Sequence, residues 1–130
     1  MRKENIITSE APSSTLYSQA VKAGNFIYLS GFVGIDSKTK KMSGETIEEQ
    51  TRQAIQNCIS VLRSAGSTLE EVVQCIVLLS NPEDFDGMNR EYARFFTKNP
   101  PARMVTKLGV ALPNVKVSIA MTAVVNSDSA

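Results

Sequence analysis

The chain has 130 residues, of which 42% are hydrophobic and 21% are charged, and its net charge is +1. This length predicts one domain, residues 1–130, with a core of its own, and no basic run is long enough to indicate tight nucleic-acid binding. Histidine is absent, which excludes a Ser-His-Asp triad, a Cys-His pair, a histidine general base and histidine metal sites.

In chain order, the first predicted elements are extended. Residues 5–8 are short and β-prone, residues 11–16 form a loop, and residues 17–21 are extended. A turn at residues 22–25 leads into a strand at residues 26–30, and together these segments indicate a β-hairpin. Residues 31–43 are polar and contain glycine, so we expect mostly loop there.

A helix beginning after Thr46 is the most clearly predicted element. Thr46 and Glu49 match a capping box, in which the hydroxyl accepts a hydrogen bond from the third helical amide and the glutamate reaches back. Gly66 is expected to end this helix. Residues at spacings of three and four predict one buried stripe, made of Ile47, Thr51, Ala54, Ile55, Cys58, Leu62 and Ala65.

The second half predicts a strand, a helix and two further strands. After a short turn at residues 67–71, residues 72–79 are apolar on both faces, as in a central strand that is covered on each side. A second helix is predicted from about residue 84 or 86 to residue 98, followed by strands at 104–109 and 115–125, with a turn at 112–114. Residues 126–130 are expected to form a frayed, polar end.

The second helix carries a stripe of apolar side chains at helical spacing, which favours a core role over a stacking platform: Phe85, Met88, Tyr92, Phe95 and Phe96. The last strand alternates cleanly, with Val117, Ile119 and Met121 on one face and Ser118 and Ala120 on the other.

Two helices can cover only one face of a five- or six-stranded sheet. The strand at residues 72–79 nevertheless predicts that both faces are dry, and the chain has no third helix to cover the second face. Another copy of the same chain is the simplest cover. We therefore expect a homo-oligomer with ligand sites near the subunit boundaries.

The two cysteines, Cys58 and Cys75, lie in apolar contexts and form no CxxC motif. They indicate reduced core thiols rather than a disulfide, a catalytic thiol or, by themselves, a zinc site, and we expect no metal. The longest purely apolar run, Cys75–Leu79, is too short to cross a membrane, and residues 1–5 lack the apolar stretch of a secretory signal. We expect a cytoplasmic protein that binds no membrane.

Arg103 is the most informative single residue. Pro100 and Pro101 stiffen the chain before it, so its side chain is delivered from a fixed backbone. A guanidinium is planar and always charged, and it binds carboxylates through two parallel hydrogen bonds. The alternative is a surface arginine beside a proline-rich turn, and base rates alone favour that alternative.

The chain resembles the reactive intermediate deaminase family (Rid, YjgF-type, also called endoribonuclease L-PSP) over nearly its full length. No single tripeptide is specific for the family, but a set of residues in the family's order and at family-like spacing gives a strong resemblance. The set consists of Ala11-Pro12, Tyr17-Ser18-Gln19-Ala20, Gly24, Ser30-Gly31, Gln50, Asn57, Ala65-Gly66, Asp84-Phe85, Asn89, Tyr92, Phe95-Phe96, Pro101-Ala102-Arg103 and Leu112-Pro113.

This resemblance implies an α+β, chorismate-mutase-like fold, with a single mixed or antiparallel sheet of about six strands and two helices on one face. It also implies a homotrimer with interfacial clefts. The implied reaction is hydrolysis of 2-imino or enamine acids to 2-oxo acids and ammonia, without a cofactor. No nucleic-acid partner is expected, and the ligand would be a small carboxylate.

The resemblance also implies roles for individual residues. Arg103 would anchor the substrate carboxylate, and Val105 would offer main-chain atoms to the imine nitrogen. Tyr17 would face the cleft, with Ser30 and Asn89 lining it. Each of the last three also has a structural interpretation. Tyr17 could fill the core, Ser30 could end a strand, and Asn89 could tie down a loop at the third helical position.

The chain departs from the family pattern at several positions. Family members typically carry a glutamate fifteen positions after the arginine, where this chain has Ser118. A serine can hold a water but cannot act as a general base near neutral pH, and such assistance contributes ~10²–10⁴ in rate. Thr15-Leu16 replaces Gly-Pro, and Phe32 replaces a glutamine after Ser-Gly. Both departures lie near the presumed cleft entrance and predict an apolar, altered pocket, and therefore an altered substrate or a lost activity.

Three functions follow. The first is an imine deaminase anchored by Arg103. The second is a regulatory binder of small carboxylates without turnover, which the missing acid favours. The third, RNA cleavage, is disfavoured because the chain has no histidine and a charge near zero. Glu45, Glu48 or Asp36 of a neighbouring subunit could supply an acid.

Overall fold

A computed structural model of the chain describes residues 2–125, and the predicted frayed end at 126–130 lies outside them. The element order is the predicted one: β1 (Lys3–Ile6), β2 (Ala20–Ala23), β3 (Phe26–Leu29), α1 (Ile47–Ser64), β4 (Val72–Leu79), α2 (Phe85–Ala93), β5 (Ala102–Lys107) and β6 (Val117–Val124). Single 3₁₀ turns at Leu69–Glu71 and Pro82–Asp84 precede β4 and α2.

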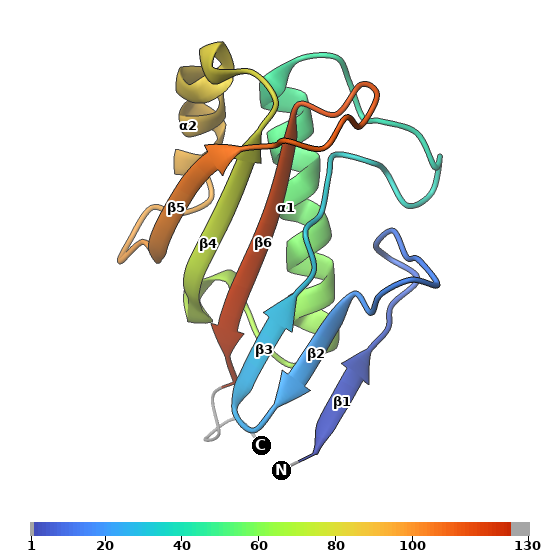
Figure 1. Cartoon of the computed structure of the whole chain (residues 1–130). Helices are drawn as coiled ribbons and strands as arrows, with labels where there is room; N and C mark the ends of the chain where they lie inside the picture. The colour runs from blue at the N-terminus through green and yellow to red at the C-terminus, as the bar shows by residue number, and fades with distance from the viewer. Residues whose placement is uncertain (1, 126–130) are drawn as a thin grey trace.

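The strands form one six-stranded sheet in the order β1-β2-β3-β6-β4-β5. Neighbouring strands are antiparallel except β4 and β5, which are parallel and are joined through α2. β5 is therefore an edge strand, and it ends the sheet on the side opposite to β1 (Figure 1). A mixed sheet of this kind, with separated helices, confirms the expected α+β architecture.

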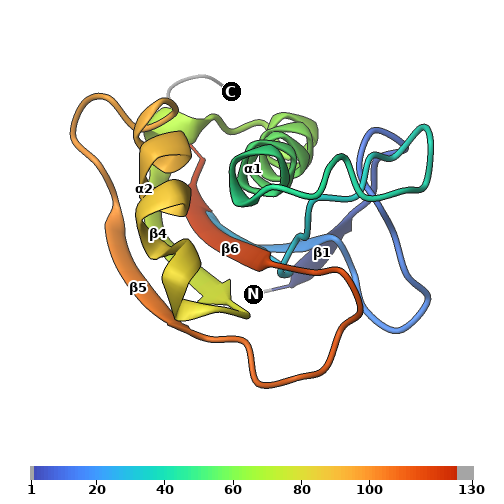
Figure 2. The same ribbon diagram turned by 90° about the horizontal axis from the view of Figure 1, so that it is seen from above.

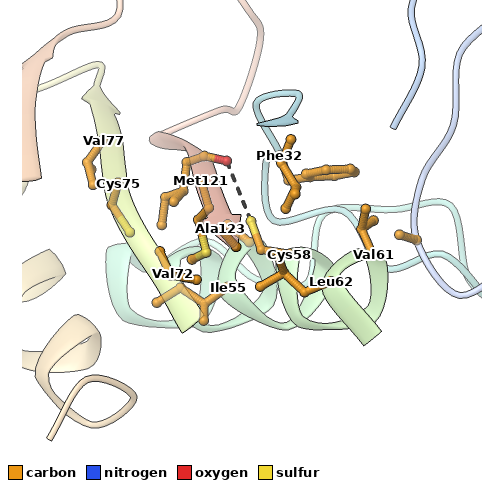
Figure 3. Close-up of a cluster of buried hydrophobic side chains, with 14 of the residues drawn as sticks. Phe32, Ile55, Cys58, Val61, Leu62, Val72, Cys75, Val77, Met121 and Ala123 are labelled. Atoms are coloured by element: carbon orange, nitrogen blue, oxygen red, sulfur yellow. Dashed lines mark hydrogen bonds between the residues drawn. The ribbon is translucent and has the colours of Figure 1, made fainter. Parts of the chain in front are cut away.

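Both helices lie on the same face of the sheet, as Figure 2 shows from above. The hydrophobic core fills the space between them and the sheet (Figure 3). Alternation along the strands decides which side chains enter it: Cys75, Val77 and Leu79 of β4 are buried, as are Ile119 and Met121 of β6. The predicted alternation of β6 is confirmed on its core face.

The opposite face of the sheet is uncovered within one chain. Large apolar side chains stand exposed on it, including Tyr28 at 50%, Ile76 at 36% and Met104 at 55%. Ile76 of β4 lies beside Met104 of β5 and Ala120 of β6 in the strand register. β4 is thus dry on one face only in the single chain.

The first helix begins as predicted. The Glu49 amide donates to the Thr46 hydroxyl at 3.1 Å, and the Thr46 amide donates to the Glu49 carboxylate at 3.2 Å. The Glu49 carboxylate also accepts from the Thr46 hydroxyl at 2.9 Å, and this bond, followed by the one from the Thr46 amide, lowers the pKa of Glu49. At the other end Gly66 adopts a φ of +84°, which glycine tolerates without strain, and the helix stops there.

Several boundaries differ from the predictions. The second strand begins at Ala20, not at residue 17, because the side chain of Gln19 bonds the backbone of residues 8–12 and holds the preceding segment in a loop. The second helix ends at Ala93 rather than at residue 98. Phe95 and Phe96 turn back onto the Tyr92 carbonyl instead and pack against the core.

Both cysteines are free and buried, as predicted. The Cys58 thiol donates to the Ile119 carbonyl at 3.6 Å and so links α1 to β6 (Figure 3). Within residues 2–125, no helix is both long enough and apolar enough to cross a lipid bilayer.

Candidate anion site between α2 and β5

Arg103 lies on edge strand β5 and points to the helix-covered face. In the strand register it stands beside Cys75, which in turn stands beside the core residue Met121. The Arg103 guanidinium carbon lies 4.8 Å from the centre of the Tyr92 ring, and its Nη1 donates to Asn89 Oδ1 at 2.7 Å. The side chain is therefore anchored by α2, while the residue remains exposed to solvent.

Tyr92 forms a neutral floor under this guanidinium. The ring is only 7% exposed, and it packs against the Phe96 ring at a centroid distance of 4.6 Å. The hydroxyl is buried next to the Cys75 thiol, and it has no nitrogen or oxygen partner among the described residues. Burial raises the pKa of Tyr92, and burial also raises the pKa of Cys75. Both groups therefore stay uncharged near neutral pH.

The sequence favoured a core role for Tyr92 over a stacking role. In the structure the ring has both roles, because it is buried and also stacks on the Arg103 guanidinium. Asn89 is the fifth residue of α2 and not the third, so it does not tie down a preceding loop. Its side-chain oxygen contacts Arg103 instead. The sequence signal was the spacing of three between Asn89 and Tyr92, which places both on one helix face.

Val105 lies two positions after Arg103 on the same face of β5, half-buried and packed against the core. Its register partner is Val77 of β4. Arg103 and Val105 therefore lie next to each other on one face of the edge strand.

Ser118 lies on the opposite face of the sheet. It differs by an odd number of positions from Met121, the core-facing residue level with Cys75 and Arg103. Gly31 covers it so closely that a Cβ added at Gly31 would lie 2.8 Å from the Ser118 hydroxyl. One chain therefore does not bring Arg103 and Ser118 to a common cleft.

Ser30 precedes that glycine and belongs to the same region. Its hydroxyl donates to the Ser18 carbonyl at 2.6 Å, and its amide donates to the Gln19 carbonyl at 3.0 Å. These bonds join the end of β3 to the loop that carries Tyr17, whose side chain is 55% exposed. Tyr17 thus does not fill the core of the single chain.

Phe32 is buried in the core at 4% exposure, and its backbone pairs with Ile119 of β6. The expectation that Phe32 lines a pocket entrance does not fit this placement. The short backbone bridge to β6 turns the side chain of Phe32 into the core. Because the two bridged residues are far apart in sequence, no local sequence pattern predicts this burial.

Three buried amide side chains organise the surrounding loops. Gln19 Nε2 donates to the carbonyls of Thr8, Ala11 and Pro12, and Asn57 Nδ2 donates to those of Val33 and Ile35. Gln50 donates to the Gly44 and Asn114 carbonyls and accepts from the Lys116 amide. These residues belong to the pattern that carries the family resemblance, but their structural roles were not predicted.

The acids suggested as replacements for the family glutamate have other surroundings within the chain. Asp36 accepts from the amides of Lys38 and Thr39, which lowers its pKa, and Glu48 pairs with Arg90 at 3.0 Å. Glu45 lines a depression of about 740 Å³ with Lys41 and Lys116. No group of three His, Cys, Asp or Glu side chains suited to a metal occurs in the part of the chain described.

The six-stranded mixed sheet with two helices on one face is the chorismate-mutase-like fold, which solved structures of endoribonuclease L-PSP proteins share. The sequence model of the endoribonuclease L-PSP family matches residues 8–125. The chain therefore belongs to that family, the Rid family of the sequence resemblance.

Individual relatives agree with this assignment. A RutC family protein of Saccharolobus solfataricus is 38% identical over 93% of this chain and 97% of its own length. The human 2-iminobutanoate/2-iminopropanoate deaminase is 32% identical over 92% of this chain and 88% of its own. A crystal structure of a Rid-family protein from Yersinia pestis superposes with a TM-score of 0.89 at 32% identity, covering 95% of this chain and all of that one.

Proposed function

We propose that this protein hydrolyses reactive 2-imino acids to 2-oxo acids and ammonia in a cleft between copies of the chain. The observation that carries the proposal is the Arg103 guanidinium, which is anchored by α2 on one side and open to solvent on the other. The human relative named a 2-iminobutanoate/2-iminopropanoate deaminase supports the substrate class, and an Arabidopsis relative named Reactive Intermediate Deaminase A supports deamination.

The substrate carboxylate pairs with Arg103 through two charge-assisted hydrogen bonds, each of which contributes about 1.5–3 kcal/mol. Main-chain atoms of Val105 hold the imine nitrogen. Water adds to the electrophilic carbon of the protonated imine and loses a proton, giving a carbinolamine. A proton then returns to the amino nitrogen of that intermediate. The hydroxyl gives up its own proton as the C–N bond breaks, so that ammonia leaves and the C=O bond of the 2-oxo acid forms.

A second copy of the chain supplies the remaining wall. Ser118, Ser30 and Tyr17 lie on or beside regions that one chain cannot bring to Arg103, and the open sheet face is the surface on which another copy would dock. We propose a homotrimer with three such clefts. Ser118 positions the attacking water by hydrogen bonding, so the rate depends on positioning rather than on a general base.

A dehydratase that generates 2-iminobutanoate, in competition with a trapping nucleophile, provides the test. Wild-type protein is expected to accelerate formation of the oxo acid, and Arg103→Ala is expected to lower kcat/KM by about 10²-fold or more through loss of both charged bonds. Arg63→Ala removes an exposed arginine of α1 and serves as the matched control. Equal rates for wild type and Arg103→Ala would remove the catalytic proposal.

The alternative function is binding of small carboxylates without turnover. β6 carries no carboxylate along its length, which favours this alternative. Calorimetry with 2-oxobutanoate and pyruvate separates the two functions, because a pure binder gives saturable heat but no acceleration. We do not propose ribonuclease activity despite the family description, because the chain lacks histidine and carries a net charge of only +1.

A further inference from the structure

Arg103 differs from the other arginines around α2 in what holds it. Arg52, Arg90 and Arg94 each pair with a glutamate carboxylate, at 2.9, 3.0 and 3.3 Å respectively. Arg103 is held by an amide oxygen and an aromatic ring instead. Both partners are neutral, so they orient the guanidinium without cancelling the charge that an anion needs.

The partners also leave one edge of the guanidinium unused. Nη1 donates to Asn89, whereas Nε and Nη2 make no hydrogen bond within residues 2–125. Because arginine is a donor only, the Asn89 atom at 2.7 Å must be its acceptor oxygen. A deprotonated carboxylate has no proton to donate, so it cannot form a hydrogen bond with this oxygen. The position of the Asn89 oxygen therefore suits Arg103 and not the anion.

The platform is itself immobilised. The Tyr92 ring is buried, stacks on Phe96 and directs its hydroxyl inward beside Cys75, so the ring cannot swing away without repacking the core. Asn89 and Tyr92 stand one helical turn apart on α2, and the cation bridges them from β5.

We propose that Asn89 and Tyr92 are positioning residues that hold the Arg103 guanidinium so that its Nε–Nη2 edge receives the ligand carboxylate. This inference deepens the proposed function, since it rests on Arg103 being the carboxylate anchor. It assigns Asn89 to the arginine instead of to the substrate, and it assigns Tyr92 a role through its ring and not through its hydroxyl.

Matched variants separate these roles in calorimetric binding of 2-oxobutanoate. Asn89→Leu removes the acceptor and is expected to weaken Kd about 3- to 10-fold, and Tyr92→Leu removes the ring with a similar loss. Tyr92→Phe keeps the ring and is expected to stay within about 2-fold of wild type. Asn89→Asp places a negative charge on Arg103 and is expected to weaken Kd at least as much as Asn89→Leu.

A second measurement needs no ligand. In ¹⁵N NMR of the arginine side chains, Arg103 is expected to show hindered rotation of its guanidinium in wild type and in Tyr92→Phe. Asn89→Leu is expected to show averaged Nη signals. Because Asn89 is only half-buried, this variant keeps the test open if Tyr92→Leu fails to fold. On adding 2-oxobutanoate to wild type, the Nε–H signal is expected to shift.

The outcomes distinguish the two proposals. Normal 2-oxobutanoate affinity in both Asn89→Leu and Tyr92→Leu, or a loss in Tyr92→Phe equal to that in Tyr92→Leu, overturns the positioning role alone. A wild-type protein that binds 2-oxobutanoate with an Nε–H shift but hydrolyses no imine removes the deaminase proposal and keeps the positioning role. If wild type gives neither binding nor a shift, Arg103 is not the anchor and both proposals fail.

Discussion

Ser118 of β6 is 8% exposed, and its hydroxyl lies close to Gly31. If the proposed reaction depends on positioning alone, a carboxylate at this position adds a base for the attacking water. Ser118→Glu is therefore expected to raise kcat for 2-iminobutanoate by about 10- to 10²-fold, with a rate that increases as the carboxyl group deprotonates. Ser118→Gln is the neutral control of the same size. Equal rates for the two variants would argue against a missing base.

The buried thiols give a pH-dependent prediction. Burial raises the pKa of Cys58 well above its usual range, so the unfolded chain loses the thiol proton first. The contribution of each such thiol to the free energy of unfolding is expected to be constant below the unfolded pKa of about 8.5 and to fall above it, by up to about 1.4 kcal/mol per pH unit. Urea melts between pH 7.5 and 9.5, compared with those of Cys58→Ala, measure this slope. Rapid labelling of Cys58 in the native protein at pH 8 would contradict it.

At this scale, residue chemistry was predicted well wherever it depends on the residue type alone. The charge of the Arg103 guanidinium follows from the residue type. The unreactive character of the Cys58 and Cys75 thiols follows from the apolar segments around them. Phe32 was not predictable, because its burial depends on a backbone bridge to Ile119. The stack of Arg103 on Tyr92 likewise requires the crossover from α2 to β5 to be known.

Among the elements, α1 does more than cover the sheet. Gln50 is 1% exposed and bonds three backbone groups in two loops. Gln50→Leu would leave those groups unpaired and is expected to destabilise the protein by about 2–4 kcal/mol. Gln56→Leu, an exposed change on the same helix, is expected to stay within about 0.5 kcal/mol of wild type. Chemical denaturation measures both, and equal stabilities would show that the loops do not depend on Gln50.

The type of each element could be predicted from the spacing of its apolar residues, which is two in a strand and three to four in a helix. The first and last residues of the elements could be predicted less accurately from this spacing. The amide of Gln19 replaces strand pairing for the segment before Ala20, and the aromatic residues after Ala93 leave the helix to reach the core. Both choices are made by long-range packing, which a local pattern does not contain.

For the whole molecule, the open sheet face predicts assembly. Phe26, Tyr28, Ile76 and Met104 are exposed there by 36–55%, and such a surface is normally covered. Light scattering is expected to give a mass near three times the 14.2 kDa of one chain. Ile76→Glu is expected to shift the mass toward that of one chain, whereas Gln56→Glu on α1 is not. A wild-type protein that remains monomeric would contradict the proposed cleft.

Asn89, Tyr92 and Arg103 all belong to the single crossover unit β4-α2-β5. The anion cradle is thus local in the chain, whereas Ser30, Tyr17 and Ser118 come from distant segments. Substitutions in those segments can change the shape of the cleft around the rest of the ligand, while Arg103 still binds its carboxylate. Such a division would let one scaffold diversify its repertoire of compounds without rebuilding the part that recognises their shared functional group.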